Sequence, residues 1–557
     1  MLILAQSNHL CAHSFVFRGM FMSLRNRIVL PVILSALAIL AACGGSSSST
    51  PTPPPSGGFT NSNFNGTYTF SFAGSDINRA IFTVSGSLVA CGCTGGTISS
   101  GTVDFVDPLN LDTAMAIGSN STYHISSDGR GTAKLMVPSG GFSTEIDVDF
   151  VLSSSSHGLI MEFDANAGGS GTIDLQPAAV TQSSLATTPF AFSISGGDNN
   201  SNPLATVGAL TLDANGNITT GVEDFNYNTT PTPQQGVTGS VTVGSGTTPG
   251  VAQINSLFGN FTFDVYAIDS THLKLIESDG QAVMVGDAFA QTNTAFPTGT
   301  LVFQMGGLDF SSFNLITTAG LMSSSGGTIS SGAQDINDGG VIDNGTTTPF
   351  SFTGIESSSG GGRYLVTLSG FAGASQFAAY PSSGGLFLLQ VDSGVGAGVM
   401  GGVALTQQST TGIAASQGYG MSLSGEDVAN GIQLDEIAEF KTNGTTTTGL
   451  VDDDETGSTS NFNGSYTAGS NGTGAATFNS GVQQIFYYGV DDSTIFFISA
   501  DPSQDQATMG TLQTQTTPTS AAFAVAKAPR ALPTPRAFSH KRNAQQRRGG
   551  HRINTFE

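Results

Sequence analysis

The chain has 557 residues, of which 10% are charged and 38% hydrophobic, with 74 glycines and no tryptophan. This composition is too apolar for a disordered chain, and its many Ser, Thr and Gly residues favour strands and turns over helices. Eleven of the 17 cations lie in the first or last 42 residues beside a single acid, so the residues between carry a net charge of about −33. Because such a body repels nucleic acid and anionic lipid, we expect it to bind no DNA or RNA.

The N-terminal segment has the pattern of an export signal. From Met22 it reads MSLRNRIVLPVILSALAILAACGG, in which Arg25 and Arg27 form a basic region and residues 28–40 form an apolar one. The apolar run is short for a membrane span, and Pro31 interrupts it. We therefore interpret residues 1–42 as a leader and signal peptide, with Met22 as the true start.

The sequence LAAC at residues 40–43 resembles the lipobox of bacterial lipoproteins. That resemblance implies diacylglycerol on the Cys43 sulfur, cleavage before Cys43 and acylation of the new N-terminus, for example by palmitate. More than one acyl chain makes such an anchor stable. Gly44 after the cysteine implies sorting to the outer membrane. The alternative is a buried cysteine in a core helix. We expect residues 43–60 to be a lipid-anchored Gly/Ser/Pro tether and the protein to lie in the bacterial cell envelope, in the outer membrane or at the cell surface.

The remainder of the chain repeats one unit four times. One element, with Gly at its fifth position and Asp at its seventh, recurs as FSFAGSD (70–76), FSISGGD (192–198), FQMGGLD (303–309) and MSLSGED (421–427). A second element, G-x4-G-x2-D, follows at 96–104, 216–224, 327–335 and 444–452. A Gly-rich element and an apolar hairpin complete each unit. We place the repeats at 61–177, 186–291, 298–408 and 412–515, followed by a basic tail, 516–557, which we expect to be disordered.

Within each repeat the apolar residues alternate with polar ones. Tyr68, Phe70 and Phe72 alternate with Thr69 and Ser71, which predicts antiparallel strands with one face in a core and the other in water. We count about eight strands per repeat, and roughly 110 residues suffice to close a core. The predicted fold is all-β: four tandem repeats, each an antiparallel β-sandwich or a small up-and-down β-barrel.

The segment LDANGNITTGVEDFN (212–226) raises the question of a calcium site. Asp213, Asn215 and Asp224 are oxygen donors at spacings that partly match a calcium loop. The other three repeats keep the glycines and the final aspartate but not the pair of first donors, so we favour a hairpin turn. In the places of Asp213 and Asn215 they have Cys93 and Gly95, Ser324 and Gly326, and Lys441 and Asn443. We expect no cofactor. The repeat-equivalent turn positions are Asp76, Asp198, Asp309, Asp427, Asp104, Asp224, Asp335 and Asp452, and the first four of these could alternatively line a shared ligand site.

Two further pairs of residues could carry chemistry. Cys91 and Cys93 lie two residues apart on a strand, so both side chains point the same way. After export we expect either a local disulfide or two free thiols, because a thiolate metal site needs further ligands. His157 and His272 occupy the same place in repeats 1 and 2, where the sequence shows no acid or nucleophile beside them. We interpret both as hairpin-turn histidines.

The whole chain resembles uncharacterised, repeat-bearing surface lipoproteins of soil bacteria in its lipobox, its tether and its repeat motifs, a resemblance that implies no activity. The first hypothesis is a non-catalytic, lipid-anchored array of domains for binding, adhesion or envelope structure, whose partners are the membrane and an envelope or extracellular ligand. The second is a carrier of a small apolar ligand inside each barrel, which a core filled by side chains would exclude. The third is a hydrolase that uses acids of one divergent repeat.

Overall fold

The computed structural model describes residues 58–516, except 139–143, 165–166, 187, 310–313, 344–348, 393–397, 479–482 and 504. The predicted signal peptide, Cys43, most of the tether and all but the first residue of the basic tail lie outside this part of the chain. Within it, no helix has the length and apolar character that a membrane crossing requires.

The described residues form 35 strands and two short helical turns, η1 (Asn61–Asn63) and α2 (Gln182–Leu185). Repeat 1 contains β1 (Asn65–Asp76), β2 (Ile81–Cys91), β3 (Ile98–Val106), β4 (Leu111–Ala116), β5 (Thr122–Ile125), β6 (Arg130–Met136), β7 (Glu145–Leu152), β8 (His157–Asp164) and β9 (Ala167–Leu175). Repeat 2 contains β10 (Pro189–Asp198), β11 (Pro203–Leu212), β12 (Ile218–Tyr227), β13 (Thr230–Gly236), β14 (Thr238–Val241), β15 (Gly250–Asn255), β16 (Asn260–Asp269), β17 (His272–Glu277) and β18 (Ala282–Ala290).

Repeat 3 contains β19 (Gly299–Asp309), β20 (Asn314–Ser325), β21 (Thr328–Asp338), β22 (Val341–Ile342), β23 (Phe350–Gly360), β24 (Arg363–Ser369), β25 (Gln376–Ser382), β26 (Gly385–Gln390) and β27 (Val399–Thr406). Repeat 4 contains β28 (Gly418–Asp427), β29 (Ile432–Asn443), β30 (Thr446–Asp453), β31 (Ser458–Ala468), β32 (Thr473–Phe478), β33 (Gln483–Gly489), β34 (Thr494–Ser499) and β35 (Gln506–Thr514). The prediction of an all-β chain is confirmed.

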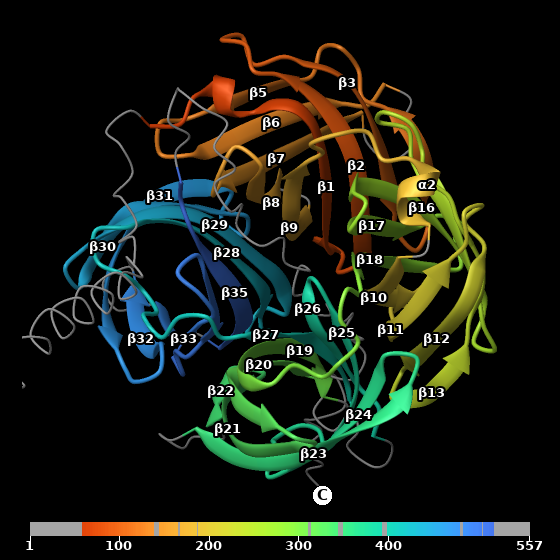
Figure 1. The fold of residues 1–557 in the computed structure, drawn as a ribbon. Helices are drawn as coiled ribbons and strands as arrows, with labels where there is room; N and C mark the ends of the chain where they lie inside the picture. The colour runs from red at the N-terminus through yellow and green to blue at the C-terminus, as the bar shows by residue number, and fades with distance from the viewer. Residues whose placement is uncertain are drawn as a thin grey trace, which may run out of the picture. The chain divides into compact units, whose positions relative to one another are not determined.

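Each repeat folds into its own antiparallel sheet, and the sheets curl into barrels (Figure 1). In repeat 4 the eight strands β28 to β35 close completely. In repeat 3 a pairing of β20 with β21 closes the sheet. Repeats 1 and 2 are nine-stranded sheets, and the isolated bridges Thr97–Thr122 and Asn217–Ser240 join residues close to their ends. Repeats 3 and 4 are thus closed barrels, and the curled sheets of repeats 1 and 2 are open barrels.

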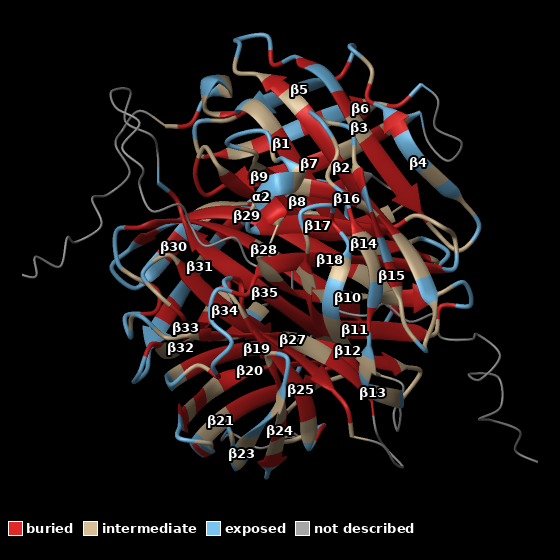
Figure 2. Ribbon diagram, turned by 45° about the vertical axis from the view of Figure 1, so that its right-hand side comes forward, coloured by how far each residue is buried: buried red, intermediate tan, exposed pale blue. Residues whose placement is uncertain are grey.

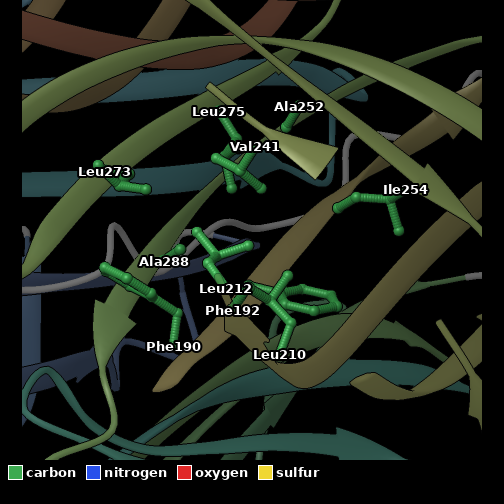
Figure 3. A pocket seen from close by; sticks show the side chains of 10 residues that line it. All are labelled: Phe190, Phe192, Leu210, Leu212, Val241, Ala252, Ile254, Leu273, Leu275 and Ala288. Carbon is green, nitrogen blue, oxygen red and sulfur yellow. The ribbon is translucent and has the colours of Figure 1, made fainter. Parts of the chain in front are cut away.

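Aromatic and aliphatic side chains fill the barrel interiors. Phe70 and Phe72 of β1 point into the core of repeat 1, and Phe190 and Phe192 of β10 point into the core of repeat 2. The apolar cavity inside barrel 2 measures only about 10 Å³ (Figure 3). That volume matches about one water molecule and is far below what a small apolar ligand occupies.

The outer faces of many strands are also buried, which differs from the expectation that they face water. Thr69 and Ser71, which alternate with the core aromatics of β1, are 1% and 0% exposed. Strands β17, β18, β28 and β35 are buried along almost their whole length (Figure 2). The physical reason is that a neighbouring repeat covers these faces, so both sides of the sheet are removed from water.

Candidate functional site

The buried outer faces form a repeated interface between consecutive barrels. The first strands of each repeat pack against the last hairpin of the next. Thus β1 and β2 contact β16, β17 and β18; β10, β11 and β12 contact β25, β26 and β27; and β19, β20 and β21 contact β33, β34 and β35. Strands β28 and β29 of repeat 4 contact β7, β8 and β9 of repeat 1. The contacts are heterologous, head to tail, and they close after four repeats, as in a cyclic oligomer.

The final aspartate of G-x4-G-x2-D meets a side chain of the neighbouring repeat at each interface. Asp104, Asp224, Asp335 and Asp452 lie in β3, β12, β21 and β30, and they are at most 6% exposed. They are therefore strand residues and not turn residues. The turn is made instead by the first glycine of the motif, for example Gly216, whose φ of 87° favours glycine.

Between repeats 2 and 3, Asp224 forms a buried ion pair with Arg363. Nε and one terminal nitrogen of Arg363 each donate to a different Asp224 oxygen at 2.6 Å, and the Tyr380 hydroxyl donates at 2.6 Å. The backbone N–H of Gln234 adds a fourth hydrogen bond at 3.1 Å. Asp224 is 0% and Arg363 4% exposed. Burial and the Asp224 carboxylate raise the pKa of Tyr380, so Tyr380 stays a hydrogen-bond donor. A bidentate guanidinium–carboxylate pair fixes both distance and orientation of two barrels.

An arginine–aspartate pair also joins repeats 4 and 1, where the arginine is Arg130. Arg130 is the first residue of β6, as Arg363 is of β24. One Arg130 nitrogen donates to the two Asp452 oxygens at 2.9 and 3.0 Å, and Nε donates to Asp128 at 3.2 Å. Thr459 also donates to Asp452. Because such a pair occurs in two alternate interfaces, it is a feature of the repeat. The pair of Arg130 and Asp452 links residues 322 positions apart in the chain.

In the other two interfaces the aspartate meets a tyrosine, as Asp224 also meets Tyr380. The Tyr488 hydroxyl of repeat 4 donates to Asp335 of repeat 3, and burial raises the pKa of Asp335 to about 7. Asp104 of repeat 1 faces Asp264 and Tyr266 of repeat 2, where burial and then the Asp264 charge raise its pKa to about 8. Tyrosine can donate to a protonated or an ionised carboxyl without bringing a second charge.

The residue two positions further along the strand also crosses the interface. Asn226 donates to the backbone oxygens of Gln390 and Gly398 at 2.9 and 3.1 Å. Asn337, in the same register, donates to the oxygens of Ser499 and Gln506 at 3.2 and 2.7 Å. Residues i and i+2 of a strand share a face, so the aspartate and the asparagine act together. Apolar side chains of repeats 2, 3 and 4 surround them, among them Phe289, Tyr380, Phe387, Tyr488 and Phe496.

The interface of repeats 1 and 2 also holds both sequence-predicted histidines near a lysine. Lys274, 0% exposed, donates to Thr172 of repeat 1 at 2.7 Å and lies 3.3 Å from Asp287. His157 pairs with Asp174 at 2.5 Å and His272 with Asp287 at 3.0 Å. Burial alone would raise the pKa of Asp174. The nearby His157, and after it Lys274, outweigh burial and lower this pKa to about 2. The cluster is an ionic contact between barrels.

Sequence reasoning missed the acid partners of both histidines. Asp174 lies directly opposite His157 across the β8–β9 pair, seventeen residues along the chain. Such a pairing follows only from the strand register, which the sequence pattern does not fix. A His–Asp pair is part of many catalytic triads. Here Nε2 of His157 has no hydrogen-bond partner among the described residues, and His157 is 2% exposed. Among the described residues, no hydroxyl or thiol therefore hydrogen-bonds this ring nitrogen as a catalytic nucleophile would.

The remaining predicted positions lie in turns. Asp76, Asp198, Asp309 and Asp427 each end a strand. The Asp198 carboxylate accepts the backbone N–H groups of Asn200 and Asn202, both at 2.8 Å, as an Asx turn does. Asp76 accepts Asn78 and Ala80 in the same way.

The three calcium candidates do not come together. Asp213 lies in the β11–β12 turn and accepts the N–H groups of Asn215 and Asn217. Asp224 lies six residues into β12, about 20 Å along the strand, and its carboxylate is bound to Arg363. Among the described residues there is no group of three acidic, His or Cys side chains that could hold a metal ion. Cys91 and Cys93 form a disulfide.

No protein-family model matches the chain, and no curated protein matches it. Among solved structures, it is similar to a mutant of the vaccine antigen transferrin binding protein B from Haemophilus parasuis, with 8% identity over 66% of this chain and 86% of that one, at a TM-score of 0.17. It is also similar to isotype 1 transferrin binding protein B from serogroup B Neisseria meningitidis, with 10% identity, coverage of 64% and 84%, and a TM-score of 0.18. TM-scores this low carry no argument about fold or function.

Proposed function

We propose that the protein is a non-catalytic, lipid-anchored component of the bacterial cell envelope whose four barrels act as one rigid binding or structural body. The observation that carries the proposal is the closed cycle of interfaces. The final aspartates of the G-x4-G-x2-D motif, such as Asp224 and Asp452, pair with side chains of neighbouring barrels. The repeat motif thus serves assembly, and recognition falls to the hairpin loops, which differ between repeats.

The filled core of barrel 2 argues against the carrier alternative. Its cavity of about 10 Å³ lies among Phe190, Phe192, Leu210 and other apolar side chains. A lipid or other small apolar ligand could enter only if these side chains moved apart, at the cost of their packing. The buried His157–Asp174 pair does not supply the two accessible carboxylates that the hydrolase alternative requires.

The chemistry of the surface indicates the kind of partner. With a net charge of about −33 on residues 43–515, the body attracts cationic surfaces over a few nanometres at low salt. We propose an envelope or extracellular partner with a basic face, bound at the outer membrane or cell surface.

Lipid attachment at Cys43 and exposure of the protein at the cell surface are tested together in a Gram-negative host. Wild type and Cys43→Ser are grown with an alkyne analogue of palmitate, fractionated, and treated as intact cells with protease. The proposal expects label on wild type alone, membrane recovery that needs Cys43, and protease sensitivity in intact cells. Label on both variants, or a soluble wild-type protein, would overturn it. Hydrolysis of ester or glycoside substrates by the purified protein would overturn the non-catalytic part.

A further inference from the structure

The disulfide of Cys91 and Cys93 is a local feature of repeat 1. It lies where β2 ends and the turn to β3 begins, and its sequence separation is two. The corresponding turns of repeats 2, 3 and 4 contain no cysteine, yet they form the same hairpin with the same glycine. The hairpin therefore does not need the disulfide in order to form.

A disulfide that closes so short a loop stabilises the fold little. Cross-linking lowers the entropy of the unfolded chain by an amount that grows with the logarithm of loop length, and here the sequence separation is only two. The repeat also holds an apolar core of its own around Phe64, Phe70 and Phe150. A role in stability is thus a weak explanation for two cysteines at this turn.

The two sulfurs have different surroundings. Cys93 is exposed, whereas Cys91 is half-buried. Backbone N–H groups of Cys93 and Thr97 point at the Cys91 sulfur at 3.1 and 3.3 Å, and the Tyr123 hydroxyl lies 3.8 Å from it. Backbone N–H donors stabilise a thiolate more than a thiol. Cys91 is therefore the better leaving group, and Cys93 is the sulfur that an incoming thiolate can reach.

We propose that Cys91 and Cys93 form a thiol–disulfide exchange site for thiols outside the cytoplasm. A thiolate RS⁻ attacks the Cys93 sulfur, forming the mixed disulfide R–S–S–Cys93 and breaking the Cys91–Cys93 bond. The electron pair of that bond remains on Cys91 as a thiolate, held by the two N–H groups. A second thiol then releases R–S–S–R, leaving two reduced cysteines, so that two thiols are oxidised and one disulfide is reduced. The reverse sequence oxidises the site.

The test uses the folded, full chain in glutathione buffers of graded reduced-to-oxidised ratio. After acid quenching, the free cysteines are alkylated and the peptide that contains Cys91 and Cys93 is analysed by mass spectrometry, which separates it from all other cysteines. The site should pass from oxidised to reduced within the accessible ratios, with an unchanged circular dichroism spectrum. A disulfide that stays intact at a roughly hundredfold excess of reduced glutathione, or that opens only as the spectrum is lost, would overturn the proposal.

The direction of attack has its own readout. Brief exposure to glutathione, followed by quenching, should trap glutathione on Cys93; predominant trapping on Cys91 would contradict the assignment of roles. The matched variants are Cys91→Ser and Cys93→Ser, each with one remaining thiol. Measured at a pH at which both thiols are ionised, the half-buried Cys91 sulfur in Cys93→Ser should react with oxidised glutathione more slowly than the exposed Cys93 sulfur in Cys91→Ser. Equal rates would contradict the assignment of Cys93 as the accessible sulfur and Cys91 as the leaving group.

Discussion

The interface between repeats 2 and 3 and the interface between repeats 4 and 1 use the same arginine–aspartate pair in different surroundings. Around Asp224 and Arg363, the apolar cluster includes Phe289, Tyr380 and Phe387. Around Asp452 and Arg130, the apolar contact is a small cluster of Val151, Leu159, Met161 and Ile437. At this second interface several buried carboxyl side chains lie where the first interface has apolar ones.

These carboxyls have raised pKa values because the neighbouring barrel removes them from water. Burial, and then the Asp452 charge, raise the pKa of Asp149 to about 7. Burial and Asp128 raise the pKa of Glu439 to about 7, and burial raises that of Asp435 to about 6. The same arginine–aspartate pair therefore occurs in two kinds of interface. Between repeats 2 and 3 apolar burial dominates, whereas between repeats 4 and 1 the stability of the contact depends on the protonation of buried carboxyls.

Asp224→Asn is expected to have the largest effect. It leaves the Arg363 guanidinium buried without its counter-charge, and breaking a buried ion pair in this way costs about 3–5 kcal/mol. The free energy of unfolding should fall by that amount in urea titrations. The double variant Asp224→Leu/Arg363→Met serves as the control and should recover part of the loss, because it removes both charges but leaves the Tyr380 hydroxyl and the Gln234 N–H without their acceptor. A loss below about 1 kcal/mol for the single variant would show that the pair is not a structural contact.

The repeat 4–repeat 1 interface should weaken as the pH rises. Asp149 and Glu439 keep their protons to about pH 7 when folded, but lose them near pH 4 when unfolded. Between these values the folded state holds more protons, so the free energy of unfolding falls with increasing pH. Hydrogen exchange in β7–β9 and β28–β29, corrected for intrinsic rates, should therefore increase from about pH 5.5 to about pH 8 relative to β10–β12 and β25–β27. Equal changes in both sets would contradict this difference.

Asp452→Asn should cost less than Asp224→Asn, on the order of 1 kcal/mol. Arg130 keeps Asp128 at 3.2 Å, so its charge is not left alone. Removing the Asp452 charge also relieves the nearby Asp149. The same urea titrations measure the difference, and the pH dependence of exchange at this interface should become shallower. A loss as large as that of Asp224→Asn would mean that the surroundings of the two pairs do not matter.

The secondary structure of the molecule follows from its sequence more directly than its interfaces do. Alternation such as Tyr68, Phe70 and Phe72 specifies a strand and its inward face locally, and repetition fixes the four units. From the sequence, by contrast, Asp224 is predicted to be the end of a turn motif. Its role depends on Arg363, which is 139 residues away in the chain. Long-range ion pairs leave no periodic pattern. The only local signal was recurrence in all four repeats, and Asp198, which accepts N–H groups of its own turn, recurs as often, so recurrence does not single out Asp224.

Asp213→Ala should have the smallest effect. Asp213 accepts N–H groups within its own exposed turn, and Gly216 keeps the turn conformation. We expect no resolvable change in urea midpoint and no change in thermal stability of the wild type on adding calcium or a chelator. A calcium-dependent rise in melting temperature that Asp213→Ala abolishes would restore the metal site in repeat 2.

The central claim is that the interfaces make four barrels into one cooperative body. It is tested most directly by hydrogen exchange and mass spectrometry across a urea titration of the full chain, with peptides from each repeat followed separately. The account predicts coincident unfolding midpoints for all four repeats, and a shift of all four midpoints in Asp224→Asn. Four distinct midpoints in the wild type, or a shift confined to repeats 2 and 3, would show that the barrels are independent domains on a common chain.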